Sequence, residues 1–252
     1  MAAIPKRVLD RFSKEVRKYQ KVLKAAKDRD INESDTVQII TDMLTSVFGF
    51  DKYTEITSEY AIKSTYCDLA VKNEDKVYFL IEAKAIGLDL KEIHVRQAVG
   101  YGAQHGIQWV ILTNGVIWEI YRIRLDKRVI NELLCSINFL EVNPRNKDDQ
   151  DKLFLLCKEG LSKAVIEGYY EHGKSVNKFI IGAILQTDEG LNLIRRELRR
   201  VSPGLKVEID EITNILVNEV LKRDTIEGDK SSEAKTRVKK AAGRSLVNRK
   251  KA

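Results

Sequence analysis

The run at residues 77–84, VYFLIEAK, is the sequence feature that most constrains the fold. It begins with apolar residues over a length typical of a buried β-strand and ends in Glu82 and Lys84. Because side chains alternate along a strand, these two charged residues share one face. A carboxylate and an ammonium on a buried strand are costly unless they pair or bind a metal. The run therefore predicts a central strand with a polar site at its end.

A second acid, Asp68, lies inside the apolar run at 67–71, fourteen residues before Glu82. If the two runs pair through the polar turn KNED, Asp68 and Glu82 approach each other at one sheet edge. Two close carboxylates repel, and a hard divalent cation relieves the repulsion. A lysine beside such a cation can orient or help deprotonate the attacking water and stabilise charge on a phosphate. The alternative is a buried salt bridge between Lys84 and one acid.

Hydrophobic periodicity predicts an α/β fold with helices packed on a mixed sheet. Asn32 is expected to cap the second helix, Gly49 to end it, and Asn114-Gly115 to form a two-residue hairpin turn. The expected helices cover 5–28, 33–48 and 91–106, and the expected strands cover 54–62, 65–72, 76–84, 109–113, 116–123 and 129–139.

The polar, turn-rich segment at 143–151 is the expected domain boundary. We expect a first domain over 1–145, a helical region over 146–223 and a basic tail over 224–252. The helical region should contain helices near 150–168, 174–186, 188–200 and 209–222. The tail is rich in Lys, Ala and Ser and has few large apolar residues, so we expect it to be disordered.

Composition limits the remaining classes of protein. No run of about 18 apolar residues exists, which argues against a membrane span. The three cysteines are far apart, which argues against a disulfide framework and favours the cytoplasm. The net charge is +7, and residues 230–252 alone hold nine Lys or Arg and one acid, Glu233. The rest of the chain is therefore close to neutral, and the positive field is assigned to the tail.

Residues 30–125 resemble the nuclease domain at the N-terminus of type I restriction enzyme R subunits and its stand-alone relatives. That domain has the PD-(D/E)xK nuclease fold, a restriction-endonuclease-like mixed sheet flanked by helices. Here a C-terminal helical segment would follow it. The segment WVILTNGVIWEIYRI resembles the strand pair that closes the domain. The matching residues are Glu33, Asp68 in YCDLAV, Glu82 and Lys84 in LIEAKAIG, and Gln97 and Tyr101 in RQAVGYGAQHG.

The resemblance implies a role for each matching residue. Asp68 and Glu82 would bind Mg²⁺ or Mn²⁺, with the Ala83 carbonyl as a further ligand. Lys84 would be the catalytic lysine, and Glu33 would help bind metal or water.

Gln97 and Tyr101 match the QxxxY element, which supports the site and nearby DNA. The alternative is an ordinary helix face with Tyr101 packed on the sheet. The chain departs from the R subunit because it lacks a GxxxxGK[ST] phosphate loop. ATP-driven translocation therefore cannot be transferred to it.

Two basic segments are candidates for DNA contact: LIRRELRR at 193–200 and the tail. The alternatives are a solvated helix face partnered by Glu197 and a solvating extension. The helix over 5–28 is interpreted as a core element or a dimer face. The candidate DNA-binding residues are Arg195, Arg199, Lys239, Lys240 and Arg244.

Together, these features predict a metal-dependent DNA endonuclease in restriction or another defence against foreign DNA. The alternative is a DNA-binding or adaptor protein that keeps the nuclease fold and cleaves little alone. A third interpretation is a repair or junction-cutting enzyme of the same fold. The expected partners are DNA and a separate methyltransferase or helicase subunit, and a homodimer stays open.

Overall fold

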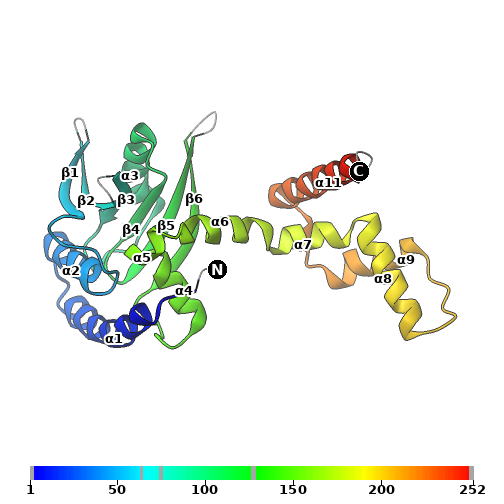
Figure 1. Cartoon of the computed structure of the whole chain (residues 1–252), viewed down its shortest axis with the longest axis horizontal. Helices are drawn as coiled ribbons and strands as arrows, with labels where there is room; N and C mark the ends of the chain where they lie inside the picture. Colours follow the sequence, from blue (N-terminus) through cyan, green and yellow to red (C-terminus); the bar gives the residue numbers. More distant parts are fainter. Residues whose placement is uncertain (1–2, 63–64, 74–75, 126–128, 250–252) are drawn as a thin grey trace. The chain divides into compact units, whose positions relative to one another are not determined.

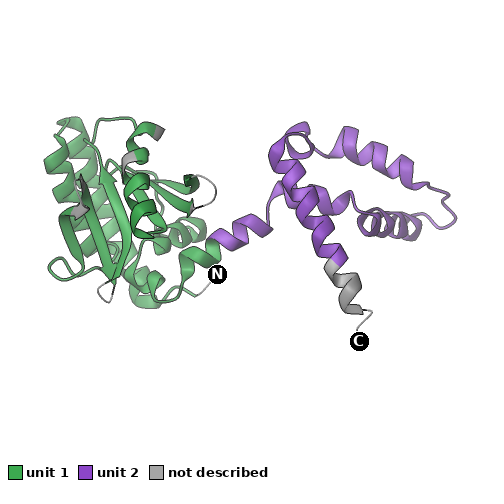
Figure 2. Ribbon diagram, turned by 90° about the horizontal axis from the view of Figure 1, so that it is seen from above, with its two compact units in different colours: residues 1–169 green, residues 170–252 purple. Residues whose placement is uncertain are grey.

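A computed structural model describes residues 3–62, 65–73, 76–125 and 129–249 (Figure 1). The chain divides into two compact units, Met1–Tyr169 and Tyr170–Ala252 (Figure 2). The first unit holds the sheet, and the second is helical. None of the helices in the described ranges is long and apolar enough to cross a membrane.

A six-stranded mixed sheet, in the order β1-β2-β3-β4-β5-β6, forms the centre of the first unit. Neighbouring strands are antiparallel except β3 and β4, which are parallel. A parallel pair needs a crossover, and α3 (Glu92–His105) provides it. The α/β prediction is confirmed. The strands are β1 (Ile56–Ile62), β2 (Thr65–Asn73), β3 (Lys76–Ala83), β4 (Trp109–Thr113), β5 (Ile117–Leu125) and β6 (Val129–Asn138).

The turn between β4 and β5 is longer than the predicted two-residue turn. Thr113 pairs with Trp118, so four residues lie between the last paired positions. The Asn114 side-chain oxygen accepts hydrogen bonds from the N–H groups of Val116 (3.1 Å) and Ile117 (2.8 Å). A side chain that replaces backbone partners in this way organises an Asx-type turn. The hairpin is therefore present, but its turn type differs.

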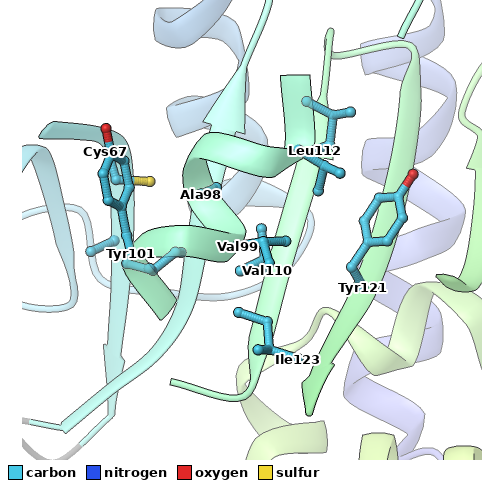
Figure 3. Close-up of a cluster of buried hydrophobic side chains, with 11 residues drawn as sticks. Cys67, Ala98, Val99, Tyr101, Val110, Leu112, Tyr121 and Ile123 are labelled. Carbon is cyan, nitrogen blue, oxygen red and sulfur yellow. The ribbon is translucent and has the colours of Figure 1, made fainter. Parts of the chain in front are cut away.

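Two helices precede the sheet, α1 (Lys6–Asp28) and α2 (Glu33–Ser46). Asn32 caps α2 as predicted, because its side chain accepts a hydrogen bond from the Asp35 N–H at 2.9 Å. Figure 3 shows α3 on one face of the sheet and shows α1 and α2 behind the sheet. The buried apolar residues of α1 recur at three- and four-residue steps: Val8, Phe12, Val16, Tyr19, Leu23 and Ala26.

The first unit extends beyond the boundary expected at 145/146. It includes α4 (Lys147–Leu155), α5 (Lys158–Leu161) and the start of α6 (Val165–Ser175). Both carboxylate oxygens of Glu159 accept hydrogen bonds from Arg11 of α1, at 2.8 and 2.9 Å. Such a bidentate pair holds α5 to a helix almost 150 residues earlier. Local composition could not reveal this pairing.

The second unit contains a small apolar core and a series of helices. Residues Leu191, Val207, Ile212 and Leu216 form the core. Several predicted helices are divided into shorter ones. The elements are α7 (Lys178–Leu185), α8 (Asp188–Val201), α9 (Ile209–Ile215), a π-helical turn (Leu216–Val220), α10 (Arg223–Ile226) and α11 (Asp229–Arg249).

The expectation of a disordered tail is wrong for the described residues, because they form α10 and α11. Ala234 and Ser231 of α11 are buried, and Arg237 donates a hydrogen bond to the Lys174 carbonyl at 2.8 Å. Alanine and lysine favour helices, and small residues allow close packing. Low hydrophobicity was therefore a poor guide here. Residues 250–252 lie outside the described ranges.

Candidate active site

The pairing of β2 with β3 brings Asp68 beside Glu82. Leu69 lies opposite Ile81 in this antiparallel pair, and Asp68 and Glu82 are the next residues outward. Opposite residues of antiparallel strands point to the same face. The Asp68 Oδ2 atom accepts a hydrogen bond from the Ala83 N–H at 2.7 Å. The structure therefore brings the two acids together at the end of β3.

Glu82 is almost completely buried, with 4% of its surface exposed. Its Oε1 accepts a hydrogen bond from Lys84 Nζ at 2.8 Å. Its Oε2 is buried and has no hydrogen-bond partner among the described residues. Burial raises the pKa of Glu82 above its usual range, and the charges of Asp68 and Glu33 add to the rise, although Lys84 opposes it. A carboxylate in this position favours an added positive charge.

Lys84 lies between two acids. Its ammonium is 2.8 Å from Glu82 Oε1 and 3.6 Å from Glu33 Oε2. Burial alone would lower the pKa of Lys84, but the hydrogen bond to Glu82 and the charges of Glu82, Glu33 and Asp68 raise it. Lys84 therefore stays protonated at neutral pH. In this state it can donate hydrogen bonds to a water or a phosphate, but it cannot accept a proton.

Thr36 connects the helix that carries Glu33 to the loop after Lys84. Its hydroxyl donates a hydrogen bond to the Asn32 carbonyl at 2.8 Å and accepts one from the Ile86 N–H at 3.2 Å. Thr36 is fully buried, so neither bond competes with solvent. Our sequence analysis missed this residue. The only signal was a hydroxyl on the apolar side of a predicted helix.

Asn114 also holds this loop. Its amide donates hydrogen bonds to the carbonyls of Leu88 (2.9 Å) and Ile86 (3.4 Å), while its oxygen organises the β4–β5 turn. The Lys84 N–H also bonds to the Thr113 carbonyl at 2.8 Å. The backbone around Lys84 is therefore fixed by buried polar contacts. The sequence marked Asn114 only as a turn residue.

Cys67 lies next to Asp68 but is unsuited to nucleophilic chemistry. It is fully buried, and its thiol lies 3.1 Å from the Ile81 carbonyl. Burial, with the charges of Glu82 and Asp68, raises the pKa of Cys67 to about 12. A thiol that stays protonated is a poor nucleophile.

Tyr101 packs into the core between α3 and the sheet (Figure 3). Only 8% of its surface is exposed, and its cluster includes Cys67, Ala98, Val110 and Leu112. This placement agrees with the alternative in which Tyr101 packs on the sheet. The side chain of Gln97 lies outside those described, so a supporting role for the QxxxY pair stays a prediction.

The candidate DNA-binding residues all belong to the second unit. On α8, Arg195 donates a hydrogen bond to Asn192 at 2.7 Å, and Arg199 is exposed. The neighbouring arginines of this helix contact Glu197, as the solvated-face alternative expects. On α11, Lys239 and Lys240 are exposed, while the Arg244 side chain lies outside those described.

The acids at the end of β3 suit a hard divalent cation, but they are not preassembled around one. Within the described residues, no group of three or more His, Cys, Asp or Glu side chains could hold a metal. The Lys84 ammonium lies near Glu82 and Glu33 instead. The buried, unpartnered Glu82 Oε2 and nearby Asp68 still offer two carboxylates, and Mg²⁺ needs only one or two.

Residues 32–135 match the family model for the N terminus of the type I restriction enzyme R protein. This segment, here the R-protein segment, is similar to that family and covers less than half of the chain. It runs from the cap of α2 into β6 and contains Glu33, Asp68, Glu82 and Lys84. Helix α1 and the chain after β6 lie outside the R-protein segment. The chain matches no curated protein and no solved structure.

Proposed function

We propose that the chain is a metal-dependent endodeoxyribonuclease that acts in restriction or another defence against foreign DNA. One observation carries the proposal. Asp68, Glu82 and Lys84 meet at the end of β3, and Glu33 lies 3.6 Å from Lys84, inside the R-protein segment. The reaction would be hydrolysis of phosphodiester bonds.

Asp68 and Glu82 would hold a Mg²⁺ or Mn²⁺ ion, with Glu33 and the Ala83 carbonyl as further ligands. When bound, such a cation supplies an activated water and stabilises charge on the scissile phosphate. Oxygen ligands of this kind are those that hard divalent cations prefer.

The protein's own residues would position the reacting groups. The protonated Lys84 would donate hydrogen bonds to the attacking water or to a phosphate oxygen, where negative charge develops. Thr36 and Asn114 hold the backbone of the loop that follows this lysine. Gln97 and Tyr101, the QxxxY pair, would support the site and nearby DNA.

A DNA-binding or adaptor protein with little activity alone is the second candidate. The observation that favours it is the position of Lys84, which already pairs with Glu82 and lies near Glu33. A buried ion pair of this kind is stable without metal. In either case the partners would be DNA and a separate methyltransferase or helicase subunit, and the compartment would be the cytoplasm.

Cleavage of supercoiled plasmid tests the proposal, with Mg²⁺, Mn²⁺ or EDTA. We expect nicked or linear product with either metal and none with EDTA. Asp68→Asn and Lys84→Gln should abolish it, whereas Glu141→Gln, which changes an exposed acid outside the site, should not. DNA binding without cleavage in every metal would support the adaptor. Equal cleavage by Asp68→Asn and wild type would refute the site.

A further inference from the structure

Positive charge in the first unit is concentrated on α1. Residues 6–28 contain nine Lys or Arg and three acids, whereas the other residues of this unit contain 17 basic and 22 acidic side chains. The net charge of the first unit is close to zero because the positive charge of α1 and the negative charge of the other residues nearly cancel. One helix therefore carries a positive field on a unit that is otherwise negative.

The basic residues of α1 lie opposite its buried stripe. Arg17, Lys21 and Lys24 follow one another at i, i+4 and i+7, which places them on one helical face. All three are exposed, while Val16 and Leu23 beside them are fully buried. The exposed basic residues on or near this face are Lys6, Arg7, Lys14, Arg17, Lys18, Lys21 and Lys24.

Acids pair with three residues of this basic face. Arg7 lies 3.7 Å from Glu159, and Lys14 and Lys18 each lie 3.4 Å from Glu15. Arg17, Lys21 and Lys24 have no ion pair among the residues that the structure describes.

The three unpaired charges extend along about 10 Å of helix, at 1.5 Å per residue. Each strand of duplex DNA carries one phosphate per 3.4 Å of the duplex axis, so a helix segment of this length faces several phosphates. The row of charges can therefore contact a phosphate backbone at more than one point.

The same end of α1 leads to the candidate active site. A Cβ on Gly115, in the β4–β5 turn, would lie 3.2 Å from a methyl group of Leu23. Asp30, just after α1, lies so close to Gly87 of the loop after Lys84 that a Cβ there would overlap its carboxylate. The basic face therefore belongs to a helix whose C-terminal end packs against the elements that hold the site.

We infer that the exposed face of α1 formed by Arg17, Lys21 and Lys24 binds the phosphate backbone of duplex DNA. The inference rests on the proposed function for its choice of DNA as the polyanion. It goes beyond that function because α1 lies outside the R-protein segment. It also replaces our sequence-based interpretation of this helix as a core element or dimer face alone.

The test compares two variants of the full chain with equal charge loss. Lys21→Gln/Lys24→Gln removes two charges from α1, and Lys76→Gln/Lys163→Gln removes two exposed lysines of the first unit outside it. Binding to a random-sequence duplex is measured by fluorescence anisotropy in EDTA, from low to moderate salt. We expect the slope of log K against log salt to flatten by up to about 2 for the α1 variant, at about 0.9 per lost contact. The control should keep the wild-type slope.

Four results would overturn the role of α1 in DNA binding. Equal slopes for both variants and wild type, or equal flattening in both variants, would overturn the inference. So would a wild type that does not bind DNA, or a dimer that the α1 variant alone loses in light scattering. Because binding is measured without metal, a wild type that binds through α1 and cleaves nothing would refute the nuclease and leave the inference standing. If the α1 variant cleaves normally and its DNA binding is unaltered, the nuclease proposal stands and the inference about α1 is refuted.

Discussion

The Asp68 carboxylate accepts a hydrogen bond from the Ala83 N–H at 2.7 Å, which ties the acid of β2 to the strand that carries Glu82 and Lys84. The acid is therefore oriented before any ligand binds. The negative charge of Asp68 and its hydrogen bond to Ala83 can be removed separately by different substitutions. Ala83 is fully buried, so its N–H depends on this acceptor.

We therefore predict different effects for two substitutions of Asp68. Asp68→Ala should lower the free energy of unfolding by about 1–3 kcal/mol, because it leaves a buried N–H without a partner. Asp68→Asn keeps an acceptor and should change stability little, while abolishing metal binding. Urea unfolding and metal titration of both variants check this. Equal stability of the two variants would contradict the role of the bond.

Substitution of Lys84 should affect catalysis and stability together. Lys84→Gln should abolish detectable cleavage, a loss of at least about 100-fold, because it removes a positioned charge beside the phosphate. Without metal it should also cost about 3 kcal/mol, since buried Glu82 loses its cation. The double variant Lys84→Gln/Glu82→Gln should recover that stability but not cleavage. Failure of the double variant to recover would show that the ion pair is not the cause.

The raised pKa of Glu82 predicts a pH dependence of stability. The folded state holds this proton more tightly than the unfolded chain. The free energy of unfolding should therefore fall as pH rises from about 4.3 through the raised folded pKa. Glu82→Gln should remove this decrease, and Mg²⁺ should offset it in wild type only. Thermal melts at several pH values, with and without Mg²⁺, measure both effects, and identical pH profiles would contradict the prediction.

Thr36 offers a test of the loop that follows Lys84. Thr36→Val preserves the shape of the side chain but removes the acceptor for the Ile86 N–H. We expect it to cost about 1–3 kcal/mol and to reduce cleavage, because the Lys84 backbone loses a support. Thr36→Ser keeps the hydroxyl and should cleave like wild type. If Val and Ser variants cleave equally, the loop does not depend on this bond.

The basic residues of α11 should be tested by substitution, not by truncation. Ser231 and Ala234 are buried, so removing residues 230–252 would uncover their packing partners. Lys239→Gln/Lys240→Gln should weaken DNA binding equally across sequences and flatten the salt slope by up to about 2. Circular dichroism should show unchanged helix content. An unchanged slope would exclude Lys239 and Lys240 as phosphate contacts.

The sequence alone determined the features that depend on near neighbours. Alternation along residues 77–84 placed Glu82 and Lys84 on one face, and both occupy that face in β3 and just after it. The Asn32 cap and the stripe of α1 follow from positions within one or two helical turns. The motif order identified the R-protein segment. These are short-range properties, because periodicity and capping need no distant partner.

Only the tertiary structure decided how distant segments meet. The Arg11–Glu159 pair joins α5 to the first unit. Ala234 is buried in a helical α11, although the low hydrophobicity of this segment predicted disorder. The hydrogen bond from Thr36 to the loop after Lys84, and the packing of Tyr101 in the core, are also long-range contacts. The raised pKa of Glu82 depends on desolvation, which exists only after the surrounding strands assemble. A linear pattern specifies which residues are apolar or charged, but burial depends on partners far along the chain.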